Sequence, residues 1–386
     1  MKKIALFVIP ILLLGTLSSI YFTNKSSVTT FSANDSISKD LNADLAKCVS
    51  EGDQRKCFTN YFTVALNKGN AKELANQIYL YRTAVPTATQ YCHDQALAVG
   101  DLAWKQYKDL DVILKFGTPV CASGFLHGVQ EAIGRDENID ASKMLAMVSK
   151  VCEVITNNDF RDSNYRVCYH GIGHAVYQKL SKVFKEGMDV CLQMSDAKDK
   201  TDKFNQSYTK RELCAEGYAM RFFEPMQPMV DKDAKMPTGK PTNILENPYI
   251  LCDKLTDPSL RYGCFEYGTR AFGHNELDYN REAYLCNLYP SVDATPCYFG
   301  ISREVAYTAE TDTFTNVDAI CAQAKDFNAG YVCGFNAILN RITINNNLEE
   351  PVAVCNKLRK TKLFIAICDT VKSHLTLTTS ENKRGI

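Results

Sequence analysis

Sixteen cysteines recur along the 386-residue chain at regular spacing, and this spacing constrains the fold more than any other feature. In the C-terminal half the first cysteine of each pair recurs after 34, 35 and 34 residues, at Cys252, Cys286, Cys321 and Cys355. The second recurs after 33, 36 and 35 residues, at Cys264, Cys297, Cys333 and Cys368. A period near 35 residues is typical of a two-helix repeat that stacks on its neighbours. Because no segment has strand periodicity, the sequence predicts an all-α, tetratricopeptide-like array of helix hairpins, an α-solenoid.

The even number of cysteines predicts that this array is stapled by disulfides. No two cysteines have the Cys-x2-Cys spacing of a zinc cluster. The repeat favours pairing between sequence neighbours, which gives Cys48–Cys57, Cys92–Cys121, Cys152–Cys168, Cys191–Cys214, Cys252–Cys264, Cys286–Cys297, Cys321–Cys333 and Cys355–Cys368. Each bridge is expected to join the end of one helix (A) to the start of the next (B). Closing a loop of about 12 residues stabilises the fold by about 3 kcal/mol.

The first residues indicate export from the cytoplasm. Lys2 and Lys3 precede a largely apolar run that ends at Phe22, which is typical of a signal peptide or of an uncleaved membrane anchor. An oxidising compartment also suits a disulfide-rich chain. We therefore expect an extracytoplasmic protein that is either secreted or anchored to the membrane by its N-terminal segment.

The organisation expected along the chain follows from these signals and from changes in repeat length. The predicted parts are a signal peptide or anchor (1–22), a flexible linker (23–42), N-terminal helical repeats with a histidine-rich strip (43–224), an irregular loop (225–248), C-terminal tight repeats (249–378) and a disordered tail (379–386). The loop is assigned because four prolines and a glycine between 225 and 241 disfavour regular structure.

The charge balance excludes one class of partner. Forty-four basic residues match forty-four acidic ones, whereas a nucleic-acid partner requires a basic field. The expected partner is instead a protein, a peptide or a glycan at the cell envelope.

Counting from each second cysteine predicts a polar strip on the B helices. Positions four and eight residues later are mostly apolar and are expected to face the core. Positions two, six and ten residues later lie on the opposite face, and we expect them to line a groove. With His93, the groove residues outside the metal candidates named below are Gln178, Glu224, Glu266, Arg270, His274, Arg303 and Tyr307.

Three histidines on this strip form a candidate metal site. His170 and His174 are four residues apart, so both imidazoles project from one helix face. His127 occupies the position equivalent to His174 on the preceding B helix. Glu131 and Glu216 are candidate carboxylate ligands, and zinc or copper is the expected divalent metal. The alternatives are a purely structural histidine cluster and an ordinary hydrated groove.

Two groups of motifs resemble known exported proteins. The elements Cys92-His93, Cys121-x-x-Gly124-x-x-His127 and Cys168-x-His170-Gly171-x-Gly173-His174 resemble a group of exported, cysteine-rich bacterial proteins without an established function. The next repeat departs from the pattern, since it has Met220 where the two before it have histidine. More loosely, the C-terminal half resembles disulfide-bridged, tetratricopeptide-related repeats. Both resemblances imply architecture and no activity.

Two functions therefore remain open from the sequence. The first is an exported or envelope-anchored scaffold that binds a ligand in a groove lined by the B helices. The alternative is a metal-dependent enzyme or a metal carrier that uses the histidine cluster, with Glu131 or Glu216 as general base.

Overall fold

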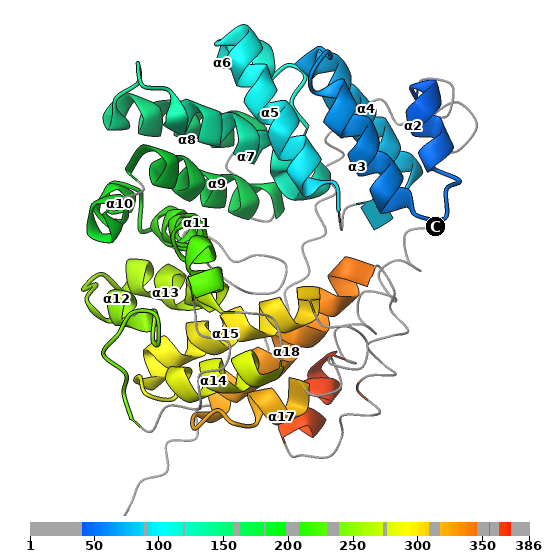
Figure 1. The fold of residues 1–386 in the computed structure, drawn as a ribbon. Helices are drawn as coiled ribbons and strands as arrows, with labels where there is room; N and C mark the ends of the chain where they lie inside the picture. Colours follow the sequence, from blue (N-terminus) through cyan, green and yellow to red (C-terminus); the bar gives the residue numbers. More distant parts are fainter. Residues whose placement is uncertain are drawn as a thin grey trace, which may run out of the picture.

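The chain folds into an array of helices joined by short connections (Figure 1). A computed structural model describes residues 41–85, 87–88, 91–118, 120–156, 163–180, 183–197, 208–229, 239–272, 276–308, 317–345, 355 and 363–371. Within these ranges the regular elements are all helical and no strand is present. The prediction of an all-α helical array is confirmed.

The helices follow one another along an arc, from α2 at the upper right of Figure 1 to α18 at the lower right. The first half contains α2 (Ala43–Cys48), α3 (Gln54–Ala65), α4 (Ala71–Ala84), α5 (His93–Tyr107), α6 (Leu110–Ile113), α7 (Val120–Arg135), α8 (Ala141–Thr156), α9 (Ser163–Leu180), α10 (Phe184–Cys191) and α11 (Lys210–Phe223). The second half contains the 3-10 helix η2 (Glu224–Met229), α12 (Tyr249–Asp253), α13 (Pro258–Tyr267), the 3-10 helix η3 (Gly268–Ala271), α14 (Glu276–Cys286), α15 (Ser291–Thr308), α17 (Val317–Cys321) and α18 (Phe327–Asn345). Residues 363–371 are also helical.

The helices that carry the second cysteines stack side by side through the array. Helix α7 packs on α9, α9 on α11, α11 on α13, α13 on α15 and α15 on α18, while α5, which follows the first cysteine of its pair, packs on α7. These B helices form a continuous layer, and shorter helices such as α8, α10 and α14 pack against their own B helix. Side chains on consecutive B helices are therefore brought next to one another.

All eight predicted disulfides are present, and no cysteine among the described residues is free. One detail of the prediction is wrong. The second cysteine does not open the B helix, because α9, α11, α13, α15 and α18 each begin several residues before it. In these five helices the bridge therefore holds the second turn, whereas in α7 the bridged Cys121 is the second residue.

Glycine recurs three residues after four of the second cysteines, at Gly124, Gly171, Gly217 and Gly300, where it is expected to let stacked helices approach closely. The structure confirms this expectation. A Cβ atom at Gly217 would overlap the carbonyl oxygen of His170 on the neighbouring helix. A Cβ atom at Gly300 would likewise overlap the carbonyl oxygen of Glu266. Glycine reduces helix stability by about 1 kcal/mol relative to alanine, so close packing accounts for its use at these positions.

The predicted irregular loop at 225–248 contains more structure than expected. Residues Glu224–Met229 form a 3-10 helix that includes Pro225. A 3-10 helix this short needs few backbone N–H donors, so it tolerates proline. The predicted signal or anchor (1–22), almost all of the predicted linker (23–42) and the tail (379–386) lie outside the described residues. Within the part that is described, no helix is both long and apolar enough to cross a membrane.

Candidate functional site

The polar strip of the B helices is brought together as predicted, but it is buried and does not line an open surface. His127 and Glu131 lie on α7, with His170 and His174 on α9. His174 is 1% exposed and Glu131 3%. The strip does not form the hydrated groove that was one of the alternatives, because each B helix is enclosed on several sides by the helices stacked around it. We call this buried series of polar side chains the B-helix row.

Four imidazole rings form a contiguous cluster in the first part of the row. The ring centroids of His127 and His174 are 4.9 Å apart, and those of His170 and His174 are also 4.9 Å apart. His127 and His170 are separated by 6.0 Å, and His93 at the start of α5 lies 5.4 Å from His127. The structure thus unites the three predicted histidines with His93, which the sequence placed in the groove. These four histidines and Glu131 are the histidine centre.

The His-Gly-x-Gly-His element has a packing explanation. A Cβ atom at Gly171 would lie 2.5 Å from Cδ2 of His127, so the glycine makes room for that ring. A Cβ atom at Gly173 would overlap the carbonyl oxygen of Cys214 on α11. The two glycines therefore let α9 approach a neighbour on each side, with a histidine at either end of the motif.

Hydrogen bonds fix which ring nitrogens carry protons. Nε2 of His127 lies 2.8 Å from the carbonyl oxygen of Val167, which can only accept, so Nε2 donates. Nδ1 of His174 donates to Oε1 of Glu131 at 3.0 Å, and Nδ1 of His93 donates to the carbonyl of Cys121 at 3.0 Å. The opposite nitrogens of His127 and His174, Nδ1 and Nε2, are buried and have no hydrogen-bond partner. Each of these nitrogens carries an unpaired lone pair in a neutral imidazole.

Burial keeps these imidazoles neutral. The pKa values of His127, His170 and His174 lie well below the ordinary value, mainly because burial disfavours the charged form. Neighbouring histidines and the guanidinium of Arg221 lower the pKa of His174 further. The cluster therefore presents hydrogen-bond acceptors rather than cations.

An unusual backbone turn lies beside His93. Cys121, Ala122 and Ser123 have φ values of 59°, 51° and 55°, which is the left-handed region that residues with a Cβ atom rarely adopt. Regular α-helical geometry in α7 thus begins only after this turn. The turn carries the carbonyl of Cys121 that accepts from His93.

Glu131 connects the histidine centre to two arginines. Besides His174, its carboxylate accepts from Nε of Arg221 at 3.0 Å and from Nη1 of Arg135 at 3.3 Å. Gln178 donates to its other oxygen at 3.3 Å. Because all of these donors converge on one buried carboxylate, Glu131 is a positioning residue for the imidazole of His174.

A second polar group, the carboxyl centre, consists of Glu216, Glu266, Arg166 and Arg303. Nη2 of Arg166 lies 3.3 Å from Glu216 and 3.0 Å from Glu266. Nη1 of Arg303 lies 2.7 Å from Glu266, and its guanidinium stacks on the ring of Tyr267 at 3.5 Å. Glu216 and Glu266 are 0% exposed. Two carboxyl groups thus share one guanidinium nitrogen in a buried environment.

These carboxyl groups hold protons more tightly than usual. Burial, and after it the nearby Glu216 carboxylate, raise the pKa of Glu266 to about 8, against the opposing effect of Arg166 and Arg303. The pKa of Glu216 is also raised, again mainly by burial. One oxygen of each, Oε1 of Glu216 and Oε2 of Glu266, is buried without a hydrogen-bond partner.

The two centres are adjacent. Nδ1 of His170 lies 3.7 Å from Glu216, and the His170 ring packs against that of Tyr267 at 4.9 Å. Among the other predicted groove residues, Arg270 pairs with Glu304 at 3.2 Å and Glu224 with Arg221 at 3.0 Å. His274 and the side chain of Tyr307 lie outside the described residues.

Two residues of the site, Arg166 and Arg221, were not predicted from the sequence. Arg166 lies one helical turn before His170, so extending the strip backwards by four residues would have found it. Arg221 lies seven residues after Cys214, outside the counted positions, and no sequence signal pointed to it. Its role depends on contact with Glu131 on another helix.

The geometry gives the metal prediction little support. Within the described ranges, no group of three or more His, Cys, Asp or Glu side chains is arranged to hold a metal ion. His127 and His174 each use one nitrogen in a hydrogen bond, which leaves one free nitrogen per ring. The residues present thus do not form a complete ligand set, and we derive no reaction step through a metal.

Comparisons with protein-family models, with curated proteins and with solved structures returned no match to this chain. The resemblance to exported cysteine-rich bacterial proteins therefore stays a prediction.

Proposed function

We propose that the protein is an extracytoplasmic helical-repeat scaffold that binds a protein, peptide or glycan ligand along the B-helix row. Eight disulfides are typical of proteins that fold in an oxidising compartment, which supports the location. Export through residues 1–22, with cleavage or with membrane anchoring, is part of the same proposal.

The observation that carries the proposal is the set of unpaired acceptors in the row. Nδ1 of His127, Nε2 of His174 and Oε1 of Glu216 are all buried without a donor. An unsatisfied buried polar group costs about 1–3 kcal/mol. A ligand that supplies hydroxyl or amide donors would recover this energy, and both glycans and peptides carry such donors.

Partly exposed arginines border the buried acceptors and give the proposed ligand a path to them. The side chains of Arg166 and Arg270 are 31% and 27% exposed. Arg166 contacts both buried carboxyl groups directly, so a ligand that reaches its guanidinium is already next to them. Arginine also suits recognition of polar ligands, because its planar fork offers several donors.

Binding can be tested on the purified oxidised protein with a glycan array and a displayed peptide library. A ligand of the row should lose at least tenfold in affinity when Glu216→Gln removes one acceptor oxygen without changing the side-chain shape. The matched control is Glu153→Gln on the exposed surface of α8, which should leave affinity unchanged. Binding that is indifferent to both substitutions would contradict a site in the row.

A metal-dependent function is the second candidate, and one observation favours it. In metal sites, a ligating histidine usually donates its second nitrogen to a carbonyl or a carboxylate. His127, His174 and His93 all donate in this way, to Val167, Glu131 and Cys121. Elemental analysis of protein prepared without chelator or tag decides the question. One equivalent of zinc or copper, lost in His127→Ala, would support the metal function, and its absence would leave the scaffold proposal alone.

A further inference from the structure

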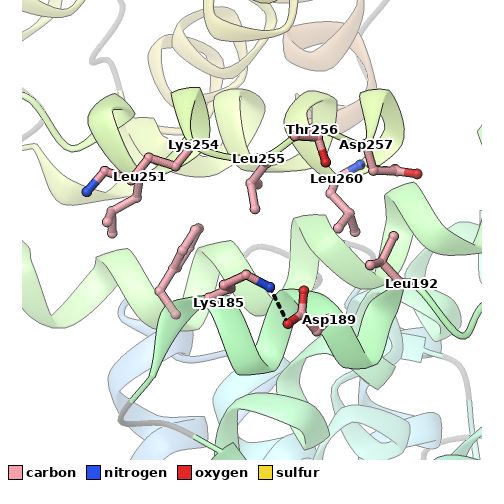
Figure 2. Close-up of a pocket in the computed structure, with 10 residues that line it drawn as sticks. Lys185, Asp189, Leu192, Leu251, Lys254, Leu255, Thr256, Asp257 and Leu260 are labelled. Atoms are coloured by element: carbon pink, nitrogen blue, oxygen red, sulfur yellow. Dashed lines mark hydrogen bonds and ion pairs between the residues drawn. The ribbon is translucent and has the colours of Figure 1, made fainter.

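A crevice on the array lies away from the B-helix row, between the short helices of two successive repeats. Figure 2 shows α10 on one side and α12 with the start of α13 on the other. The crevice has a volume of about 290 Å³. Its lining includes the apolar side chains of Phe184, Leu255 and Leu260 and the charged side chains of Lys185, Asp189 and Lys254.

The apolar surface continues outside the crevice. Leu192, which lines the crevice, is 38% exposed, and Val183 at the start of α10 is 44% exposed. Most other large apolar side chains in the described residues are buried. Apolar side chains that gather around a concavity are typical of interaction sites, whereas single exposed ones are common on any surface.

The crevice walls are held in place by a polar network centred on Arg211. Its guanidinium donates to the carbonyl of Leu192 at 3.3 Å and to Asp257 at 2.7 Å. Asp257 also caps α13 by accepting from the backbone of Leu260 at 3.0 Å. At the other end of α10, the hydroxyl of Tyr218 donates to the carbonyl of Val183 at 3.2 Å. A site with fixed walls loses little conformational entropy when it binds.

Some of the charged side chains that line the crevice have an ion-pair partner, and one does not. Lys185 pairs with Asp189 at 2.6 Å, and Asp257 pairs with Arg211 at 2.7 Å. Lys254 is exposed and forms no ion pair within the described part of the chain. The unpaired charge in the lining is therefore positive, and its complement is a carboxylate.

We propose that this crevice is a docking site for a peptide segment of a protein partner, with a large apolar side chain seated on Leu255 and Leu260 and a neighbouring Asp or Glu paired with Lys254. The volume is at the lower end of the range for whole small-molecule ligands, about 300–1,000 Å³, so one or two side chains fill it. Insertion of apolar anchors from an amphipathic segment is a common mode of peptide recognition.

Selection of peptides from a random displayed library on the oxidised full-length protein tests this site. The expected consensus places Leu, Ile, Phe or Trp next to Asp or Glu. Its affinity should fall at least tenfold in Leu192→Asp and in Lys254→Glu, both of which alter exposed side chains. Lys254→Glu should also shift a repeated selection toward Lys or Arg at the acidic position. Val292→Asp, at a 74% exposed apolar residue on α15, is the matched control and should not change binding.

Several outcomes would overturn the proposal. Failure to enrich such a consensus would contradict the site. So would an affinity that is the same in Leu192→Asp and Lys254→Glu as in the Val292→Asp control. A dimer that Leu192→Asp dissociates in sedimentation experiments would make the occupant a second copy of the chain. Binding to phosphatidylcholine vesicles that depends on Leu192 would make it a lipid surface. Circular dichroism of each variant separates lost binding from lost folding. Because Glu216→Gln should leave this site intact, failure here is distinguishable from failure of binding in the B-helix row.

Discussion

The histidine centre and the carboxyl centre occupy the same row of the same array, yet burial acts on them in opposite directions. Burial removes protons from the imidazoles of His170 and His174, whereas it keeps a proton on Glu266 at neutral pH. In both cases the low-polarity surroundings favour the uncharged form. The row therefore carries less charge than its residue types suggest, and its permanent cations are the arginines. The comparison shows that position on the strip does not determine chemistry, whereas the surrounding helices do.

The largest expected effect on stability comes from removing Glu131, the carboxylate on which the donors of the histidine centre converge. Glu131→Leu deletes the acceptor of His174 and Arg221 and leaves a part-buried guanidinium without its main partner. Breaking a buried pair in this way costs about 3–5 kcal/mol in the free energy of unfolding. Denaturant titration measures the loss. Glu224→Leu removes the other, more exposed partner of Arg221 and should cost less than about 1 kcal/mol. Equal losses of stability in Glu131→Leu and Glu224→Leu would show that Glu131 is not the main partner of these side chains.

The disulfides that flank the two centres should differ in their contribution to stability. Cys92–Cys121 closes a loop of 29 residues beside the histidine centre, and Cys286–Cys297 closes one of 11 at the base of the helix that carries Arg303. In the chain-entropy model these loops correspond to about 3.6 and about 2.8 kcal/mol. Replacing each pair by alanines and measuring denaturant unfolding under oxidising conditions gives the two values. A greater loss at the shorter loop would show that local packing outweighs loop closure.

Raising the pH should lower the stability of the protein through the carboxyl centre. The folded pKa of Glu266 is about 8 against an ordinary value of 4.5, so the native state holds a proton that the unfolded chain releases. This group therefore lowers stability as pH rises from about 4.5 to about 8, by at most about 1.4 kcal/mol per pH unit. Glu266→Gln lacks that loss, so its stability relative to wild type should increase over the same window. Unfolding curves at pH 5, 6.5 and 8 check this, and a difference that is constant with pH would contradict it.

Lowering the pH should give the opposite response in the histidine centre. The folded pKa of His174 lies well below 6.5, so the unfolded chain binds a proton that the native state does not. Wild-type stability should fall as pH drops below about 6.5, with about 1.4 kcal/mol per pH unit as the limit for this one group. His174→Gln removes the contribution of His174 to this pH dependence and leaves the contributions of His127 and His170. The expected change in stability is therefore the smallest of the four predicted in this Discussion. The Glu266→Gln protein is the control, since substitution there should not weaken the response below pH 6.5. An unchanged acid response in His174→Gln would show that folding does not lower the pKa of His174.

Much of the fold was predictable because it depends on local and periodic signals. The repeat length indicated helix hairpins, and equivalent positions in successive hairpins indicated pairing between neighbours such as Cys252 and Cys264, which the structure contains. The glycines indicated close helix approach, and Gly217 against His170 is such a contact. The proximity of His127 to His174 was predictable for the same reason, since equivalent positions on stacked helices must lie side by side.

The partners of these side chains were not predictable from the sequence. Arg221 reaches Glu131 across 90 residues, and Arg166 reaches Glu266 across 100. Periodicity gives the angle of a residue around its own helix, but it does not say what lies against that face. For this reason a polar strip that was expected to line a groove is buried, and its unpaired acceptors and protonation states follow from the burial. The sequence by itself determined the array and its disulfides, because both repeat locally. The tertiary structure alone decided the chemistry of the row, because that chemistry depends on contacts between distant helices.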